Sequence, residues 1–457
     1  MTEAGGSGRA AAPPVQYAAI DFGASSGRVV CGRFDGRVMT LEPCHRFPNR
    51  PVRLPDGLRW NLLQLFAEAV GALRGRRLDG VGVDTWGVDY ALLDEHGRAL
   101  GLPFHYRDQR TEGASGVAGY EITGIQDMLI NTVYQLLAER DSPALRAAHS
   151  IALVPDLLAY WLSGELANEV TNASTTALLD ARTGTWALGL IEQLGLPTRP
   201  FGELVEPGTA LGDVLSHHGF DAPVYTVASH DTASAFAATP LRDEHSAILS
   251  SGTWSLLGLE LPGPVFADPA LTNERGVDGT IRLLKNVMGL WLEQECARVW
   301  DAGFTELHDA ARAVTGTVPS FDPDDERFLR GGDMPALIAE ACGRSEMSRG
   351  EVVRSIYVSL AHKYRRVLER LEAASGRDVR TLHVIGGGAQ NALLCQLTAD
   401  VTGREVLAGP VEATALGNVL VQARASGELG SLADMRTVSA ASFEPVHYEP
   451  SRQEIST

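Results

Sequence analysis

The strongest constraint on the fold of this chain is a pattern that occurs twice. An apolar run leads into the glycine- and serine-rich turn DFGASSGR at residues 21–28, and a second apolar run follows it. The same order surrounds SSGTWS at residues 250–255. Apolar runs bounded by Gly and Ser are typical of strands joined by tight turns. The chain is therefore predicted to be an α/β protein built from two related halves.

Between these turns the sequence alternates helical and strand patterns. An amphipathic helix is predicted over 61–75 and one buried strand over 78–94. The dipeptide Asp35-Gly36 predicts a hairpin turn before them. A long helix over 351–374, with apolar residues on one face, is followed by a strand and a helix.

The stretch 237–246 is polar and contains proline, as linkers do. We therefore predict a flexible tail over 1–15, a first domain over 16–240 and a second domain over 245–457.

Composition excludes several classes of partner. The 457 residues carry a net charge of −18, which argues against nucleic acid or an anionic membrane as the main partner. No run of about 18 apolar residues occurs, so no membrane span is predicted. The first residues lack the apolar core of a signal peptide. Five cysteines without a C-x-x-C pair argue against a disulfide framework or a thiolate zinc site and favour a cytoplasmic location.

The two turns can bind phosphate. Consecutive backbone N–H groups in such a turn form an anion site, and hydroxyl groups add donors. Asp21 at the strand end could hold Mg²⁺. Each turn alone could equally be an ordinary hairpin with a capping acid, but two of them in facing halves favour a nucleotide held between the halves. The run VIGGGAQN at 384–391 offers a third close backbone approach. There is no P-loop, since neither of the two lysines follows a glycine-rich loop, and no dinucleotide fingerprint.

A polyhydroxylated ligand is indicated by a separate group of side chains. Carboxylates, a guanidinium and aromatic rings recur in DTWGVDYALLD and HYRDQRT. The alternative is a buried ion pair beside a core tryptophan. The candidates are Asp84, Trp86, Asp89, Tyr106, Asp108 and Arg110.

The stretch SHDTASAF at 229–236 supplies a candidate base. An acid after the predicted strand 223–228 could cap a helix, or it could accept a proton from a substrate hydroxyl. If one half binds ATP and the other a sugar, Asp231 stands where that proton acceptor is needed, because phosphoryl transfer requires positioning, a metal and a modest base. His230 could contact the sugar or only pack.

Taken together, these motifs resemble the FGGY carbohydrate kinases, and among them most closely the branch that acts on L-rhamnulose. The similarity runs from about residue 16 to about 430. It rests on DFGASSGR, DTWGVD, YRDQRT, NTVYQL, HDTASA, SSGTWSLLG, NVMGLWL, GGGAQN and GPVEATALGN, in that order. The resemblance implies two ribonuclease-H-like domains of the actin-like ATPase superfamily with a central cleft. It also implies transfer of the γ-phosphoryl group of ATP, with Mg²⁺, to O1 of L-rhamnulose in L-rhamnose catabolism.

The resemblance also assigns residues. It makes Asp231 the proton acceptor and Asp21 the metal-associated acid. It places the sugar against Gly87, His230, Asp231, Thr232 and Asn286. It places ATP against Ala24, Ser25, Ser26, Gly27, Arg28, Thr253, Gln294 and Gly387.

Two alternatives stay open at this stage. The substrate could be another ketose, such as L-fuculose, D-xylulose or another pentulose, because sites diverge within one fold. The chain could instead be an actin-like ATPase that binds no sugar. Intact sugar motifs and an intact Asp231 argue against this second reading.

Overall fold

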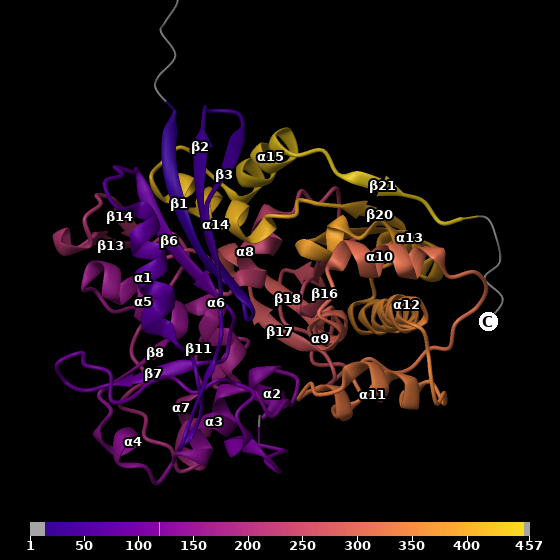
Figure 1. Ribbon diagram of the computed structural model, residues 1–457. Coiled ribbons are helices and arrows are strands. Elements are labelled where there is room, and N and C mark those ends of the chain that lie inside the picture. The colour runs from indigo at the N-terminus through magenta and orange to yellow at the C-terminus, as the bar shows by residue number, and fades with distance from the viewer. Residues whose placement is uncertain (1–13, 118, 452–457) are drawn as a thin grey trace, which may run out of the picture.

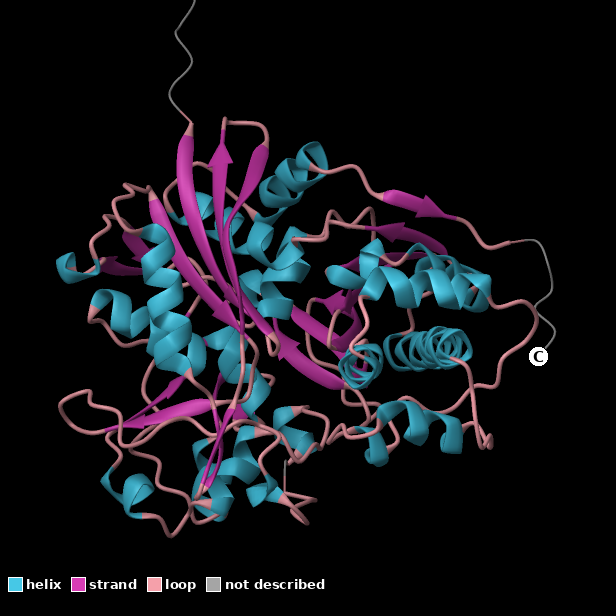
Figure 2. Ribbon diagram, in the orientation of Figure 1, coloured by secondary structure: helices cyan, strands magenta, loops and turns pink. Residues whose placement is uncertain are grey.

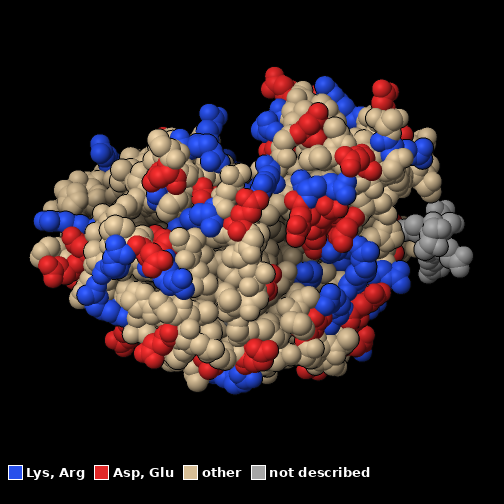
Figure 3. Space-filling view, turned by 90° about the horizontal axis from the view of Figure 1, so that it is seen from below, with Lys and Arg blue, Asp and Glu red and all other residues tan. Residues whose placement is uncertain are grey.

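The computed structural model describes residues 14–117 and 119–451. Residues 1–13 of the predicted tail over 1–15 therefore lie outside the described residues. Two mixed sheets dominate the molecule, with helices on the faces of each (Figures 1 and 2). None of the helices in the described ranges combines the length and the apolarity needed to cross a bilayer. On the face drawn in Figure 3, positive and negative side chains are interspersed.

The first sheet has the strand order β13-β14-β6-β1-β2-β3. Its strands are β1 (Val15–Phe22), β2 (Ser26–Phe34), β3 (Met39–Pro48), β6 (Gly80–Thr85), β13 (Ala210–Asp213) and β14 (Pro223–Tyr225). Strands β1, β2 and β3 are antiparallel neighbours, whereas β6 runs parallel to both β1 and β14.

The second sheet has the order β17-β18-β16-β15-β19-β20-β21. Its strands are β15 (Ser246–Ser251), β16 (Trp254–Leu261), β17 (Thr272–Arg275), β18 (Ile281–Met288), β19 (Thr381–Ile385), β20 (Glu405–Ala408) and β21 (Val446–Tyr448). Here β15, β16 and β18 are antiparallel neighbours, while β15, β19 and β20 run parallel.

Five strands of each sheet therefore repeat one topology. The order β3-β2-β1-β6-β14 corresponds to β18-β16-β15-β19-β20, with the same sequence of antiparallel and parallel pairs. Both predicted glycine turns join the first two strands of their sheet. The prediction of two related α/β halves is confirmed, and so is the hairpin turn at Asp35-Gly36, where Gly36 has φ 92°.

Both faces of the first sheet are covered. Alternate residues of β1 point to opposite faces, and Ile20 packs with α1 (Leu62–Leu73) and α5 (Val154–Ser163). Ala19 on the other face packs with α8 (Asp231–Ala238), α14 (Ala413–Ala425) and α15 (Leu432–Ser442). A strand that is buried on both sides reads as one continuous apolar run, which is why the sequence signalled it clearly.

Helix α8 lies between the two sheets. Ala233 and Ala237 pack with the first sheet, whereas Ala235 and Phe236 pack with Ile248 and Leu284 of the second. Helix α8 also contacts α14, a helix near the C-terminal end of the sequence that lies beside the first strands in Figure 1. Any residue at the start of α8 is thus held by both halves of the molecule.

The close approach of α14 depends on glycines. A Cβ on Gly417 would lie 1.8 Å from the carbonyl oxygen of Ser234 in α8. Gly82 in β6 faces Asn418 in the same way, with 2.9 Å to its Oδ1. Helix α14 also donates from Asn418 and Gln422 to the backbone of β6 and β1. The glycines of the sequence GVGVDT thus make room for a helix.

The second sheet is covered by further helices. They are α9 (Trp291–Trp300), α10 (Phe304–Ala313), α11 (Met334–Ala341), α12 (Arg349–Ser375) and α13 (Ala392–Thr402). The predicted helix over 351–374 is confirmed as the core of α12, which opens on a capping box formed by Ser348 and Glu351.

Smaller elements fill the region below the first sheet in Figure 1. They are β4 (Val52–Leu54), β5 (Gly57–Arg59), β7 (Tyr90–Leu93), α2 (Tyr120–Thr123), α3 (Thr132–Ala138), α4 (Pro143–Ala147), β8 (Ser150–Leu153), β9 (Asn168–Glu169), α6 (Val170–Ala173), β10 (Leu179–Asp180), β11 (Thr185–Trp186), α7 (Leu188–Gln193) and β12 (Leu204–Val205). The prediction of one strand over 78–94 is wrong. The chain leaves β6 at Thr85, turns through Val88 with φ 69°, and enters a different sheet at Tyr90.

Candidate active site

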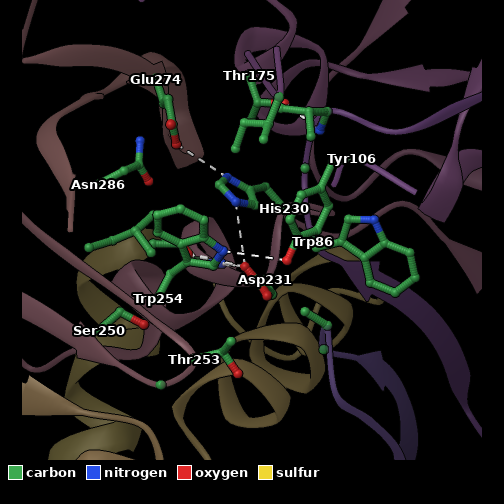
Figure 4. Close-up of a pocket in the computed structure, with 18 of the residues that line it drawn as sticks. Trp86, Tyr106, Thr175, His230, Asp231, Ser250, Thr253, Trp254, Glu274 and Asn286 are labelled. Carbon is green, nitrogen blue, oxygen red and sulfur yellow. Dashed lines mark hydrogen bonds and ion pairs between the residues drawn. The ribbon is translucent and has the colours of Figure 1, made fainter. Parts of the chain in front are cut away.

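A cleft of about 230 Å³ lies between the two sheets. Its walls come from the turns after β1, β6, β15 and β19, from the start of α8, and from β17 and β18. Figure 4 shows Asp231 and His230 near its centre, with Trp86 and Tyr106 on one side, Trp254 and Asn286 on the other, and Ser250 and Thr253 below.

Two carboxylates stand side by side at the ends of β1 and β6, and Asp21 lines the cleft while Asp84 lies behind its surface. Asp21 ends β1, and its partner across the parallel pair is Asp84 at the end of β6. Asp84 is fully buried; its Oδ2 accepts from Asn418 Nδ2 at 2.5 Å, and its Oδ1 accepts no hydrogen bond among the described residues. Burial and the neighbouring Asp21 raise the pKa of Asp84 well above its usual range. This end of the two strands therefore carries an oxygen atom in need of a positive partner.

Arg28 now neutralises part of this charge. Its guanidinium lies 2.6 Å from Asp21 Oδ2 and also pairs with Glu412 at the start of α14. Asp21 and Asp84 supply the hard oxygen ligands that suit a magnesium ion, which typically binds one or two carboxylates and substrate phosphates. No set of three or more His, Cys, Asp or Glu side chains in the described part of the chain forms a metal cage. The residues thus fit a metal that is shared with a substrate.

Asp231 is the first residue of α8, and His230 is the N-cap. The Oδ1 atom of Asp231 accepts from the backbone N–H of Thr232 at 2.5 Å and from the Thr232 hydroxyl at 3.1 Å. Its side chain keeps 29% of its surface exposed to the cleft. Loss of hydration raises the pKa of Asp231, although His230 opposes the shift and Asp21 adds to it. Asp231 thus lines the cleft with a partly exposed carboxylate, while its Oδ1 also accepts from the first turn of α8.

Behind His230 lies a buried ion pair. Glu274 on β17 and Arg282 on β18 face each other across the sheet, with Arg282 Nη1 3.0 Å from Glu274 Oε2. Arg282 Nη2 lies 3.2 Å from His230 Nδ1, and His230 Nε2 lies 3.5 Å from Asp231 Oδ1. A chain of polar and charged side chains therefore links the second sheet to the start of α8.

Most predicted site residues line the cleft. They are Asp21, Ala24, Ser25, Arg28, Gly87, His230, Asp231, Thr232, Thr253, Asn286 and Gly387. Three of the predicted ATP-binding residues do not. Ser26 and Gly27 already belong to β2, and a Cβ on Gly27 would lie 2.4 Å from the Phe47 ring, so packing explains this glycine. Gln294 lies just outside the lining, where its Oε1 accepts from the Thr253 hydroxyl at 3.1 Å.

Of the residues predicted to bind a polyhydroxylated ligand, Trp86 and Tyr106 line the cleft and the four charged ones do not. Asp89 is buried, and its oxygens accept from Trp60, Trp86 and the backbone of Tyr106, and from Gln135. Burial raises its pKa to about 6. The carboxylate therefore orients the ring of Trp86 instead of meeting a ligand.

Asp108 and Arg110 are also structural. Asp108 accepts from the backbone of Leu58 at 2.6 Å and of Arg110 at 3.0 Å. The Arg110 guanidinium lies 3.7 Å from the centre of the Phe104 ring and donates to Gln135. The alternative of a buried ion pair beside a core tryptophan does not describe them either, because Arg110 pairs with Glu139 and not with Asp108.

Several cleft residues were not anticipated from the sequence. Trp254, Thr175 and Glu274 line the cleft, and Val88 does so with its backbone in the left-handed region. Such a φ is rare for a β-branched residue and occurs mainly at functional sites. Thr175 fixes this turn, because its hydroxyl accepts from Val88 N–H at 3.0 Å. Trp254 follows the SSGT turn directly. This position next to a predicted phosphate turn was the only sequence feature that could have indicated a cleft residue here.

Two similar sheets that face one cleft, with glycine turns and carboxylates at its edges, define a two-domain enzyme of the kinase type. Models of the FGGY family of carbohydrate kinases match the chain over residues 17–237 for the N-terminal domain and 247–426 for the C-terminal domain. The chain belongs to this family.

Curated relatives narrow the similarity. The chain is 41% identical to a rhamnulokinase of Bacteroides thetaiotaomicron, over 95% of this chain and 96% of the relative. It is also 41% identical to a rhamnulokinase of Pectobacterium atrosepticum, over 94% and 92% of the two chains.

Solved structures share the fold at low identity. A gluconate kinase from Lactobacillus acidophilus matches with a TM-score of 0.76 at 13% identity, over 96% of this chain and 94% of that one. A Plasmodium falciparum glycerol kinase with ADP matches with a TM-score of 0.74 at 15% identity, over 96% and 94%. The expected two-domain α/β fold is thereby confirmed.

Proposed function

We propose that this protein is a rhamnulokinase, which transfers the γ-phosphoryl group of ATP to O1 of L-rhamnulose in the cytoplasm. The single observation that carries the proposal is the 41% identity to rhamnulokinases over nearly the whole chain. The cleft supports it, since hydroxyl-bearing turns lie on one side of Asp231 and aromatic and amide side chains lie on the other. The domain limits 16–240 and 245–457 belong to the same proposal, with the sugar on the first domain and ATP on the second.

In this mechanism the turns hold the nucleotide phosphates. Ala24, Ser25 and Thr253 line the cleft from two hairpins, where backbone N–H groups would hold the phosphates. Gly387, which also lines the cleft, would leave room for the adenosine. Asp21 and Asp84 would hold Mg²⁺, which supplies charge neutralisation for the transferred phosphoryl group. Arg28, which pairs with Asp21 and Glu412 and lines the cleft, would supply positive charge to the phosphates.

Asp231 accepts the proton of the attacking hydroxyl. The sugar lies among Gly87, His230, Thr232 and Asn286, with its reacting oxygen toward Asp231. A carboxylate suffices as base, because phosphoryl transfer passes through a loose transition state in which the O–H proton leaves late. Trp86, Tyr106 and Trp254 narrow the sugar side and exclude water.

The deciding experiment is a ketose panel with ATP and Mg²⁺, comparing kcat/KM for L-rhamnulose, L-fuculose, D-xylulose, L-ribulose, L-xylulose and glycerol. We expect the highest kcat/KM with L-rhamnulose. A higher value for another ketose would overturn the substrate assignment and leave the kinase fold and Asp231 unaffected. A related ketose is the second candidate, because a single methyl group changes binding by only about 1–3 kcal/mol.

The acid limb of the pH profile of kcat/KM reports Asp231. The carboxylate must be ionised to act, and burial raises its pKa, so activity should fall on acidification at a higher pH than an ordinary Asp would give. The Thr232 hydroxyl opposes this shift. Thr232→Val should therefore move the acid limb further upward. A limb at the pH of an ordinary Asp, insensitive to Thr232→Val, would contradict the assignment.

A further inference from the structure

The mechanism proposed above leaves unused the charge pair behind His230. Arg282 is 0% exposed and Glu274 is 4% exposed, and neither is among the residues that the family resemblance assigned to ATP or sugar. A buried ion pair is a weak source of stability, because desolvation offsets the attraction of the charges. The pair comes from the second sheet, yet it reaches a residue that directly precedes α8. The pair therefore acts on the site through its contacts with His230.

The contacts of Arg282 determine which ring nitrogen of His230 carries the proton. A guanidinium has only donors. Arg282 Nη2 lies 3.2 Å from Nδ1 with hydrogen-bond geometry. Because the guanidinium can only donate, this contact favours an Nδ1 that accepts and a ring proton on Nε2.

Glu274 Oε2 is also 3.2 Å from Nδ1, but among the described residues it accepts no hydrogen bond of suitable geometry. Burial works against ionisation of Glu274, but the Arg282 guanidinium opposes this effect, and the pKa is lowered. Glu274 thus stays charged and holds Arg282 in place.

We propose that Arg282, anchored by Glu274, fixes His230 as the Nε2–H tautomer, so that the imidazole presents a donor to the cleft beside Asp231. Nε2 lies 3.5 Å from Asp231 Oδ1 (Figure 4). There the N–H group can donate to an oxygen of the ketose next to the hydroxyl that Asp231 deprotonates. The opposite tautomer would turn a lone pair toward the carboxylate and could accept from a sugar hydroxyl but not donate to a ketose oxygen. Arg282 and Glu274 are positioning residues in this sense, and their effect on catalysis rests on the proposed sugar-kinase function.

The tautomer is measured on the whole enzyme without substrate. Long-range ¹⁵N–¹H correlation spectra of protein labelled with ¹⁵N-histidine distinguish protonated from bare ring nitrogens, and the signals of His230 among the 12 histidines are those missing in His230→Asn. We expect a bare Nδ1 and a protonated Nε2. A proton on Nδ1, alone or together with one on Nε2, would overturn the inference.

Variants test whether the charge pair is the cause. Removing Arg282 alone would leave Glu274 buried and unpaired, so Glu274→Gln and Arg282→Met are combined. We expect the double variant to place part of the proton on Nδ1 and to lower kcat/KM for the ketose by roughly 10- to 100-fold through KM of the sugar, as for one lost hydrogen bond in a buried site. KM for ATP should be unchanged.

Arg282→Lys, which keeps a cation with only donors, should retain the Nε2–H tautomer. Arg275→Met is the matched control, because this arginine lies on β17 beside Glu274 but donates to Gly279 O. A double variant with the tautomer and the sugar KM of the natural enzyme would refute the proposal.

The two proposals fail separately. The tautomer is a property of the free enzyme, so turnover of a different ketose, or of none, would overturn the proposed function without changing the spectrum. Conversely, turnover of L-rhamnulose by an enzyme with the proton on Nδ1 would overturn this inference alone.

Discussion

The enzyme with Asp231→Asn is expected to lose about 10²- to 10⁴-fold in kcat while still binding ATP. Asn keeps the size of the side chain and can still accept from the Thr232 N–H, so α8 should start as it does now. What the amide cannot do is take the proton of the sugar hydroxyl. The measurement is steady-state kinetics with saturating ketose and Mg·ATP, together with calorimetry of ATP binding.

Asp309→Asn on the exposed side of α10 serves as the control for the charge change, and it should leave kcat unaltered. If Asp231→Asn turned over at the natural rate, another group would have to be the proton acceptor. If ATP binding disappeared along with turnover, the loss would reflect a misplaced cleft and not missing base chemistry.

Gly417→Ala is expected to have the largest effect on stability. The new Cβ would lie 1.8 Å from Ser234 O and 2.5 Å from the Ser234 carbonyl carbon, which are backbone atoms of α8 and cannot rotate away. Helices α8 and α14 must then separate, at a cost of about 3 kcal/mol or more. Because α8 begins at Asp231, the proposed base moves with the helix, and a shift of about 1 Å can cost 10²-fold in rate. The midpoint temperature of thermal unfolding and kcat should therefore both decrease in this variant.

Gly71→Ala is the matched control. Gly71 also lies inside a helix, α1, but a Cβ there would have no neighbour within 4 Å. Because Ala is the better helix former, this variant should be more stable by up to about 1 kcal/mol. Equal stability of Gly417→Ala and the natural enzyme would show that the two helices are not held at the distance described here.

The sequence was sufficient to predict the repeated topology because its signal is local. An apolar run, a glycine turn and another apolar run lie within about 20 residues of each other, and both copies carry the signal in full. The start of α8 was recognisable for a similar reason, since Asp231 comes a few residues after the apolar run that contains β14 and precedes a run of small residues.

The partners of buried polar groups could not be predicted in this way. Asp89 appeared to be a ligand residue, but its donors Trp60 and Gln135 come from segments 29 and 46 residues away. Likewise, Asn418 meets Asp84 across 334 positions of the chain. The sequence does not show whether a substrate or a tryptophan donates the hydrogen bonds that a carboxylate accepts. Only the tertiary structure identifies the donor.

The position of α14 and α15 on the first sheet has a consequence for how the chain is made. During synthesis β1 and β2 emerge early, yet α14 and α15, two of the three helices that pack on the face of Tyr17, Ala19 and Val30, lie beyond residue 412. One face of these early strands therefore stays without part of its apolar cover until α14 and α15 have been synthesised. Long-range contacts of this kind slow folding and expose surface to aggregation. The first half of the molecule is synthesised before the second, but the packing of its sheet is completed only when the C-terminal helices have been synthesised.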